Sequence, residues 1–150
     1  MRPSLRIVAA IAFVLGAAQA VRFESSNPPV AGDAQPPPDV ATGLRSACYD
    51  CHSNETRWPW YASLAPVSWL VHRDVSEGRR RLNFSVWSEY VVDPGTRTQK
   101  LEHIRELVLR GAMPPWYYRL VHPSSRWTDL QRDEVLHWVD AEIAASSTTP

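Results

Sequence analysis

The 150-residue sequence predicts a single small domain built only of α-helices. Four segments repeat apolar residues at helical spacing, and no segment of useful length alternates apolar and polar residues as a half-buried strand does. Apolar residues make up 44% of the chain, which is enough for a core without crosslinks. The chain also holds seven tryptophans, more than a core of this size needs. We therefore expect a compact helical domain with long, tryptophan-rich connections, whose spare aromatic rings can enclose a flat ligand.

Residues 1–20 are predicted to be an export signal. Arg2 and Arg6 supply a basic start, an apolar stretch follows, and Ala18-Gln19-Ala20 matches an A-x-A cleavage site. An uncleaved membrane anchor is the alternative, although the uncharged stretch from Ile7 to Val21 has 15 residues against about 20 for a comfortable span. Both alternatives deliver the rest of the chain to the same side. The expected location is periplasmic or exported, with or without attachment to the inner membrane.

Residues 21–38 are predicted to be a proline-rich linker. Five prolines in this part of the chain remove backbone donors and fix φ, so neither a helix nor a sheet is expected there. The linker would behave as a semi-rigid spacer. The folded domain is then expected over residues 39–145, with a flexible tail at 146–150.

The first helix of the domain is predicted to start at Asp39 and to end at or just after the two-cysteine motif of residues 48–52. The second is predicted from Pro66, a residue suited to the first turn of a helix, to about Gly78. Four apolar side chains share one face of this second helix: Val67, Leu70, Val71 and Val75.

The third helix is predicted from about Thr98 to Arg110, with Gly111 placed to stop it. The last begins at Thr128, whose hydroxyl can cap the helix while Gln131 reaches back. Both helices have an apolar face that should point inward. In the third helix it consists of Leu101, Ile104, Leu107 and Val108, and in the last of Val135, Leu136, Val139 and Ile143.

The motif that carries chemistry is Cys48-Tyr49-Asp50-Cys51-His52, which has the C-x-x-C-H pattern of c-type haem attachment. Two thiols at this spacing can reach the two vinyl groups on one side of a porphyrin, and the next residue then places an imidazole beneath the iron. Export is consistent with this reading. We expect one covalent haem per chain, attached through Cys48 and Cys51, with His52 as the proximal iron ligand.

Three alternatives do without haem. An exported protein with two cysteines often forms a disulfide, and C-x-x-C is also a dithiol redox motif. Neither explains His52 or the surrounding aromatic residues, and no strand precedes the motif. A structural zinc site would need about four cysteine or histidine ligands and a second paired cluster, which the sequence lacks.

Met113 is the predicted distal ligand of the iron. Apart from the initiator it is the only methionine, and Pro114 disfavours helical geometry at this position. Ligation by His52 and Met113 would raise the reduction potential and favour electron transfer. A gap-filling core methionine remains the plain alternative, and His122 is the competing ligand because it lies in an irregular segment nearby. The other histidines are expected at the surface: His72, His103 and His137.

Four stretches together resemble the bacterial haem-binding domain family, which comprises small c-type cytochrome-like proteins. They are "CYDCHSNETRWPWY", "APVSWLVHRDVSEGRRRLNFSVW", "MPPWYYRLVH" and "LHWVDAEI", and the resemblance runs from about Asn27 to Ile143. It implies a cytochrome c-like helical fold with a single covalent haem on Cys48 and Cys51, and His52 as proximal ligand.

The resemblance also suggests which residues surround the cofactor. Trp58 and Tyr61 are the expected cofactor-binding aromatic residues, and further candidates for either the pocket or the core are Trp60, Trp69, Trp87 and Trp116. A guanidinium suits a haem propionate, so one residue of the run Arg79 to Arg81 could bind it, unless the run is only a solvated helix end.

The expected function is single-electron transfer by an exported monohaem c-type cytochrome that is not an enzyme and that serves unidentified redox partner proteins. Without Arg2 and Arg6 the chain has 14 basic and 16 acidic residues and no basic stripe, which argues against binding nucleic acid. A haem-based redox or gas sensor with an open or exchangeable distal site is the alternative. A thiol oxidoreductase without haem is a third hypothesis.

Overall fold

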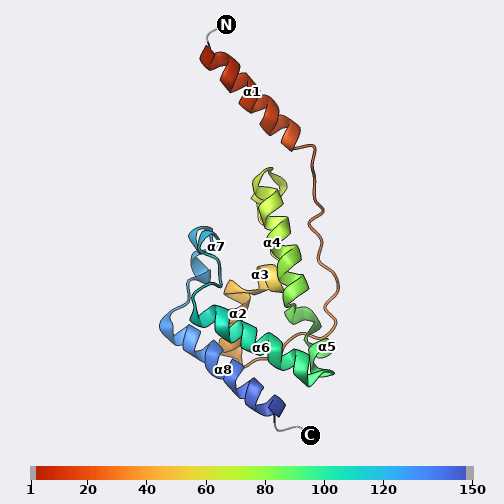
Figure 1. Cartoon of the computed structure of the whole chain (residues 1–150), viewed down its shortest axis with the longest axis vertical. Coiled ribbons are helices and arrows are strands. Elements are labelled where there is room, and N and C mark those ends of the chain that lie inside the picture. Colours follow the sequence, from red (N-terminus) through yellow and green to blue (C-terminus); the bar gives the residue numbers. More distant parts are fainter. Residues whose placement is uncertain (1–2, 148–150) are drawn as a thin grey trace.

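The computed structural model describes residues 3–147 and has no strand within that range, which confirms the predicted all-α class (Figure 1). Short 3-10 helices (η) connect the α-helices. In chain order the elements are α1 (Pro3–Ala18), α2 (Pro38–Ala47), α3 (Tyr49–His52), η1 (Trp60–Ser63), α4 (Val67–Arg81), η2 (Phe84–Val86), α5 (Trp87–Val91), α6 (Pro94–Leu109), α7 (Trp116–Val121), η3 (Pro123–Ser125) and α8 (Asp129–Ser147).

The core lies where α8 packs against both α2 and α6. Four of its aliphatic side chains are completely buried: Leu44, Leu101, Val135 and Val139. Aromatic rings extend the core, since Trp87 lies 5.8 Å from Phe84 and 6.2 Å from Trp138, measured between ring centroids. Trp87, a candidate for either the cofactor pocket or the core, therefore belongs to the core.

Local signals placed several helix ends correctly. Thr128 N donates to Gln131 Oε1 at 3.0 Å and Gln131 N donates to Thr128 Oγ1 at 3.2 Å, which is the predicted cap of the last helix. Gly111 follows the end of α6 with a φ of +63°, a conformation that glycine adopts at little cost. The helical segment that carries the two-cysteine motif ends at His52, within the predicted limit, after a break at Cys48.

Other boundaries differ from the prediction. α6 begins at Pro94 instead of about Thr98, because Asp93 caps it by accepting a hydrogen bond from Gly95 N at 3.1 Å. α4 continues past the predicted end to Arg81. The segment after Met113, expected to be irregular, forms the short helix α7, because its two prolines precede the helix and do not interrupt it.

Residues 23–34, which we call the strap, run in extended form along the domain. Described residues 21–36 contain neither helix nor strand, as the prolines predict. The strap is hydrogen-bonded along its length: Asn27 Nδ2 donates to Thr56 O at 3.0 Å, and Ala34 N donates to Phe84 O at 3.0 Å. The strap is therefore packed as part of the folded unit. The predicted boundaries of the signal, linker, domain and tail stay predictions.

Arg79 holds the strap to the segment that follows the two-cysteine motif. Its Nε donates to Ser53 O at 2.8 Å and its Nη1 to Ser26 O at 3.1 Å. Its Nη2 donates to Asn27 Oδ1 at 2.7 Å and to Thr56 Oγ1 at 2.9 Å. These four hydrogen bonds make the guanidinium a structural clamp, which leaves little donor capacity for a propionate.

Replacing Arg79 with alanine is expected to lower the free energy of unfolding by about 2–3 kcal/mol, because hydrogen bonds from a charged donor are lost and their acceptors left unpaired. Urea unfolding followed by far-UV circular dichroism measures it. Arg80→Ala is the matched control: Arg80 is exposed and only pairs with Glu77, so no measurable change is expected. An equal change in the free energy of unfolding for both substitutions would contradict a stabilising role of the Arg79 hydrogen bonds.

Helix α1 stands apart from the domain in Figure 1, and residues 4–17 are exposed. Directly after it, Gln19 Nε2 donates to Ala65 O at 3.0 Å and Ala65 N donates to Gln19 Oε1 at 3.1 Å. Among residues 3–147, no helix is both long enough and apolar enough to cross a membrane. The basic residue Arg2 and residues 148–150 of the predicted tail lie outside the described residues, and Ser146 and Ser147 belong to α8.

Candidate functional site

The two cysteines lie on the short helical segment between α2 and α4. Cys48 separates α2 from α3, Cys51 lies within α3, and neither forms a disulfide. Burial raises the pKa of both thiols to about 12, and the carboxylates of Asp74 and Asp50 also raise that of Cys51. Both are therefore protonated at neutral pH. A dithiol redox site has the opposite property, a thiol whose pKa is lowered.

His52 is oriented by two backbone carbonyls. Its Nδ1 lies 3.0 Å from Gly78 O and 3.1 Å from Leu82 O, at the end of α4. Since carbonyl oxygens only accept hydrogen bonds, the proton of the neutral ring is on Nδ1 and the lone pair is on Nε2. Burial lowers the pKa of His52, which favours this neutral form. An imidazole held through Nδ1 in this way has the usual arrangement of a metal ligand.

Gly78 allows α4 to approach the two-cysteine motif closely. A Cβ atom on this residue would lie 2.3 Å from Cys51 O and 2.9 Å from Cys51 C. These are backbone atoms, so no side-chain rotation could relieve the contact. The close approach brings Gly78 O within hydrogen-bond distance of His52 Nδ1. The lack of a side chain at Gly78 therefore makes room for the motif, and its carbonyl oxygen orients the imidazole.

Two adjoining cavities open beside the motif. The smaller, of about 160 Å³, is lined among others by Cys48, Cys51, His52 and Met113. The larger, of about 350 Å³, lies within the usual size range of small-molecule sites. Four residues line both and so connect them: Cys51, Asp74, Tyr117 and Tyr118.

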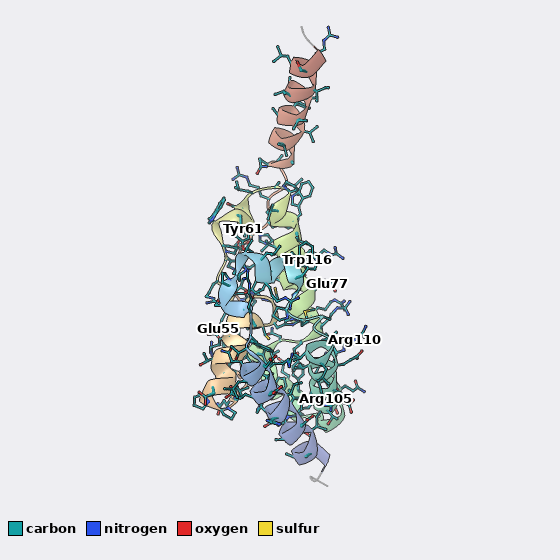
Figure 2. The ribbon with its side chains drawn as sticks, turned by 90° about the vertical axis from the view of Figure 1, so that its left-hand side faces the viewer. Glu55, Tyr61, Glu77, Arg105, Arg110 and Trp116 are labelled. Carbon is teal, nitrogen blue, oxygen red and sulfur yellow. The ribbon has the colours of Figure 1, made fainter. Side chains whose placement is uncertain are left out.

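The apolar face predicted on α4 forms one wall of the larger cavity. All four residues of that face line the cavity: Val67, Leu70, Val71 and Val75. Val67 and Leu70 keep 47% and 41% of their surface exposed, which a core position would not allow. Tyr61, which is labelled in Figure 2, also lines this cavity. An apolar wall left open beside two free thiols and an oriented imidazole fits an apolar, flat group such as haem.

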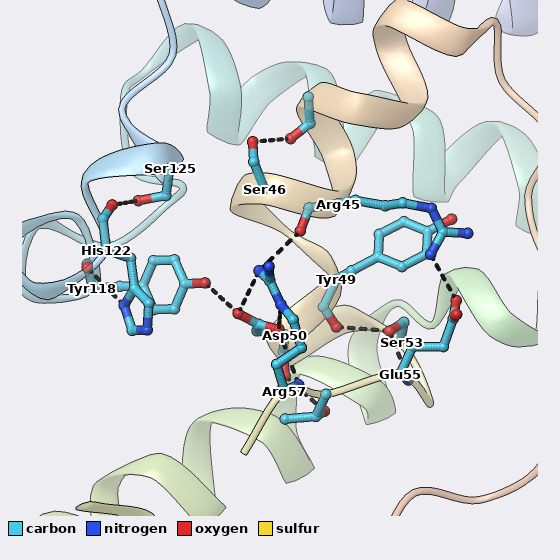
Figure 3. A network of polar contacts seen from close by, with 12 residues as sticks. Arg45, Ser46, Tyr49, Asp50, Ser53, Glu55, Arg57, Tyr118, His122 and Ser125 are labelled. Carbon is cyan, nitrogen blue, oxygen red and sulfur yellow. Dashed lines mark hydrogen bonds and ion pairs between the residues drawn. The ribbon is translucent and has the colours of Figure 1, made fainter. Parts of the chain in front are cut away.

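A polar network closes the other side of the larger cavity (Figure 3). The Asp50 carboxylate accepts hydrogen bonds from Tyr118 Oη at 2.7 Å and from Arg57 Nη2 at 3.0 Å. Burial by itself would raise the pKa of Asp50, but the hydrogen bonds from Arg57 and Tyr118 outweigh it and hold that pKa below its usual range. The network ties α7 to the motif helix α3.

His122 belongs to the same network. Its Nδ1 donates to Tyr118 O at 3.1 Å, so its Nε2 is the acceptor for Tyr61 Oη at 3.2 Å. Its ring also stacks on that of Tyr118, with 4.0 Å between the centroids. Both nitrogens of His122 are thus engaged, whereas Met113 lines the same cavity as His52.

The structure brings most of the predicted site residues together. Cys48, Cys51, His52 and Met113 meet at the smaller cavity and Tyr61 reaches the larger one. Trp60, a further candidate, also lines the larger cavity, whereas Trp58 lies outside both linings.

Trp58 instead packs against the strap side of the domain. Its ring stacks on His72 at 4.7 Å, and its Nε1 donates to Asn27 Oδ1 at 3.2 Å. Proximity to the motif in the sequence could not show whether Trp58 faces the cavities or the strap. His72 is accordingly half-buried and not at the surface, while the exposure expected for His103 and His137 is observed.

Two elements of the site were not anticipated from the sequence. Gly78 was interpreted only as a helix end, although a glycine inside a helical pattern can signal a close contact. The pairing of Asp50 with Tyr118 joins residues 68 positions apart and has no local signal. Of the arginine run, Arg81 lines the smaller cavity and Arg79 holds the strap.

Comparison with known proteins agrees with this geometry. A family model described as a haem-binding domain matches residues 7–141. Cytochrome c peroxidase Ccp of Escherichia coli (strain K12) is 26% identical over 106 residues, which are 68% of this chain and 23% of that protein. The chain therefore spans about a quarter of the length of this curated relative. No solved structure matches the chain.

Proposed function

Because the chain belongs to the haem-binding domain family, we propose that it is an exported c-type cytochrome that binds one haem covalently and transfers single electrons. The observation that carries this proposal is the meeting of Cys48, Cys51, His52 and Met113 at one cavity. Both cysteines are free thiols beside a space bounded by an apolar wall. A disulfide would need neither the oriented imidazole nor that wall, and a zinc site would not need the wall.

In this proposal each residue has a separate task. Cys48 and Cys51 form the two thioether bonds, and His52 offers Nε2 as the proximal ligand while its Nδ1 stays hydrogen-bonded to α4. Met113 offers its thioether as the distal ligand. When bound, the haem iron supplies a one-electron couple, whose potential such ligation raises.

The remaining residues of the two cavities control the surroundings. The apolar face of α4 excludes water, which favours the less charged state of a bound group. Arg81 is the member of the arginine run that reaches the smaller cavity, and its guanidinium could bind a propionate. Asp50, Arg57 and Tyr118 keep α7 in place, and with it the segment that carries Met113.

Methionine ligation is tested by comparing Met113→Ala with His122→Ala. Met113→Ala is expected to remove the weak long-wavelength charge-transfer band of methionine-ligated ferric haem and to lower the reduction potential. His122→Ala should leave the band in place, because both nitrogens of His122 are engaged with tyrosines. Absorption spectra and a redox titration measure both effects. A wild-type protein without the band, whose spectrum changes in His122→Ala and not in Met113→Ala, would reverse the assignment.

A second candidate function is a haem-based sensor or binding module with an exchangeable distal position. The observation in its favour is the open larger cavity, which adjoins the cavity of Cys48 and His52. Rapid carbon monoxide binding by the reduced wild-type protein would favour this function. A ferrous protein that does not bind carbon monoxide would favour electron transfer.

Export and membrane attachment are also part of the proposal. They are supported by the basic residues, the apolar stretch and the A-x-A site of residues 1–20. The intact mass of the protein from its native host shows whether residues 1–20 are retained and whether haem is attached. The partners in electron transfer would be redox proteins.

A further inference from the structure

One end of the domain carries a group of exposed apolar side chains, which we call the apolar tip. It consists of Val21, Phe23, Trp60, Leu64 and Trp69. Trp60 is 77% exposed, and the other four are between 39% and 51% exposed. Isolated apolar side chains are common on protein surfaces, but a group of them marks a contact surface.

Direct contacts show that the segments of the apolar tip adjoin one another. Phe23 stacks on His72 of α4 with 5.2 Å between ring centroids, and His72 Nε2 lies 3.2 Å from Ala62 O of η1. Trp60 belongs to η1, Leu64 follows it, and Trp69 is in the first turn of α4. Residues 21–23 and 60–69, which are separate in the sequence, therefore form one end of the molecule.

Helix α1 ends at this same place. Gln19, the first residue after α1, makes two hydrogen bonds to the backbone of Ala65, between Leu64 and α4. No free linker separates the helix from the tip, and Figure 1 shows α1 beyond the end of α4. The exposed apolar side chains of α1 include Leu5, Ile7, Val8, Ile11, Phe13, Val14 and Leu15. A helix that is apolar all round requires an apolar surrounding.

The charges around the tip favour an anionic surface. No acidic residue occurs between Glu55 and Asp74, whereas Arg73 lies within that stretch and Arg57 is already paired with Asp50. Arg22 is inside the tip segment itself, and Glu24 is the acidic residue beside it. Basic residues near a bilayer are attracted to anionic headgroups, and tryptophan prefers the boundary between headgroups and acyl chains.

We propose that the apolar tip sits in the interfacial layer of the bilayer that takes up α1. The apolar tip then adds its own contact to the one made by α1 and fixes the orientation of the domain, because Gln19 holds the two together. This proposal rests on the proposed membrane attachment, and it concerns the chain that retains residues 1–20.

Hydroxyl-radical footprinting of the full-length, haem-loaded protein tests the proposal, with and without vesicles of phosphatidylcholine and phosphatidylglycerol. Trp60 and Leu64 are expected to lose most of their labelling when vesicles are added. Leu130 is 69% exposed on α8 and should be labelled equally in both samples. Flotation of the vesicles, read in the same samples, measures attachment independently.

A matched pair of substitutions gives the second measurement. Leu64→Ser should weaken vesicle binding roughly threefold to tenfold, since a partly buried leucine contributes on the order of 1 kcal/mol. Leu130→Ser should leave vesicle binding unchanged. The absorption spectrum of each variant serves as the control for folding and haem binding.

The possible failures are distinguishable. If the protein floats with vesicles but Trp60 and Leu64 keep their full labelling, the apolar tip does not contact the bilayer, and attachment by α1 alone accounts for binding. A protein that does not float would overturn both, while the haem spectrum would still report on the proposed function. A native chain that begins at Val21 lacks Gln19 and would also overturn the proposal.

Discussion

The double variant Cys48→Ser, Cys51→Ser is expected to release all of its haem into acid acetone, whereas the wild-type protein retains it. Both cysteines are free and border the cavity that also contains His52 and Met113, so each can form a thioether bond. Serine keeps nearly the same size but cannot form that bond. The intact mass of the variant should equal that of the polypeptide alone.

Met113→Ala is the matched control, because it changes a side chain at the same cavity without touching the attachment points. It should keep its haem in acid acetone, while its absorption spectrum and its reduction potential change. Wild-type haem that is extracted by acid acetone would disprove covalent attachment. A double variant that retains haem would show that attachment involves another residue.

Gly78→Ala is expected to destabilise the protein by about 2–3 kcal/mol and to reduce the amount of haem-loaded protein recovered. The added methyl group would lie 2.3 Å from Cys51 O, so α4 must move away from the motif. That movement breaks the hydrogen bond between His52 Nδ1 and Gly78 O and disturbs the orientation of the ligand. Urea unfolding and the haem-to-protein absorbance ratio measure the two effects.

Gly43→Ala is the matched control within a helix of the same domain. A Cβ on Gly43 would meet Val135 and Trp127 at 3.6 Å and 3.7 Å, which are ordinary contacts. Alanine is favoured over glycine in helices by about 1 kcal/mol, so this variant should be as stable as the wild type or more stable. A Gly78→Ala protein as stable as Gly43→Ala would contradict the close approach of α4 to the motif.

Features set by neighbouring residues could be predicted from the sequence. The cap formed by Thr128 and Gln131 and the stop at Gly111 depend on a few adjacent positions, and both are observed. The start of α6 also had a local signal, because Asp93 before Pro94 is a usual cap and first helical residue. The prediction placed the start later because it followed the apolar periodicity alone.

Apolar periodicity identifies the face of a helix but not what covers it. The face of α4 that includes Val67, Leu70 and Val71 was identified correctly, yet it borders a cavity. The periodicity of α6 was similar, and its Leu101 is completely buried in the core. A cofactor and a neighbouring helix impose the same spacing on a sequence, so only the three-dimensional structure separates them.

Contacts between distant segments had no signal in the sequence. The run Arg79 to Arg81 offered a propionate ligand because a guanidinium suits a carboxylate, but the acceptors of Arg79 include Ser26 and Asn27, 53 and 52 residues away. Trp58 likewise donates a hydrogen bond to Asn27 of the strap, a distant contact that its position beside the motif does not reveal. The grouping of Cys48, Cys51 and His52 was predictable because the chemistry itself fixes their spacing.

The packing of α2 against α8 has a consequence for the order of events during biogenesis. Trp127, just before α8, donates through Nε1 to Gly43 O of α2 at 3.0 Å, across 84 residues of sequence. In a chain that is exported N-terminus first, the segment with Cys48 and Cys51 therefore emerges long before the helix that will cover α2. During that interval the two thiols are accessible to other molecules, and the interval ends only when the later segments that border the motif, including α4 and Met113, have emerged. Slower translocation of residues 53–147 would lengthen this period, and faster translocation would shorten it.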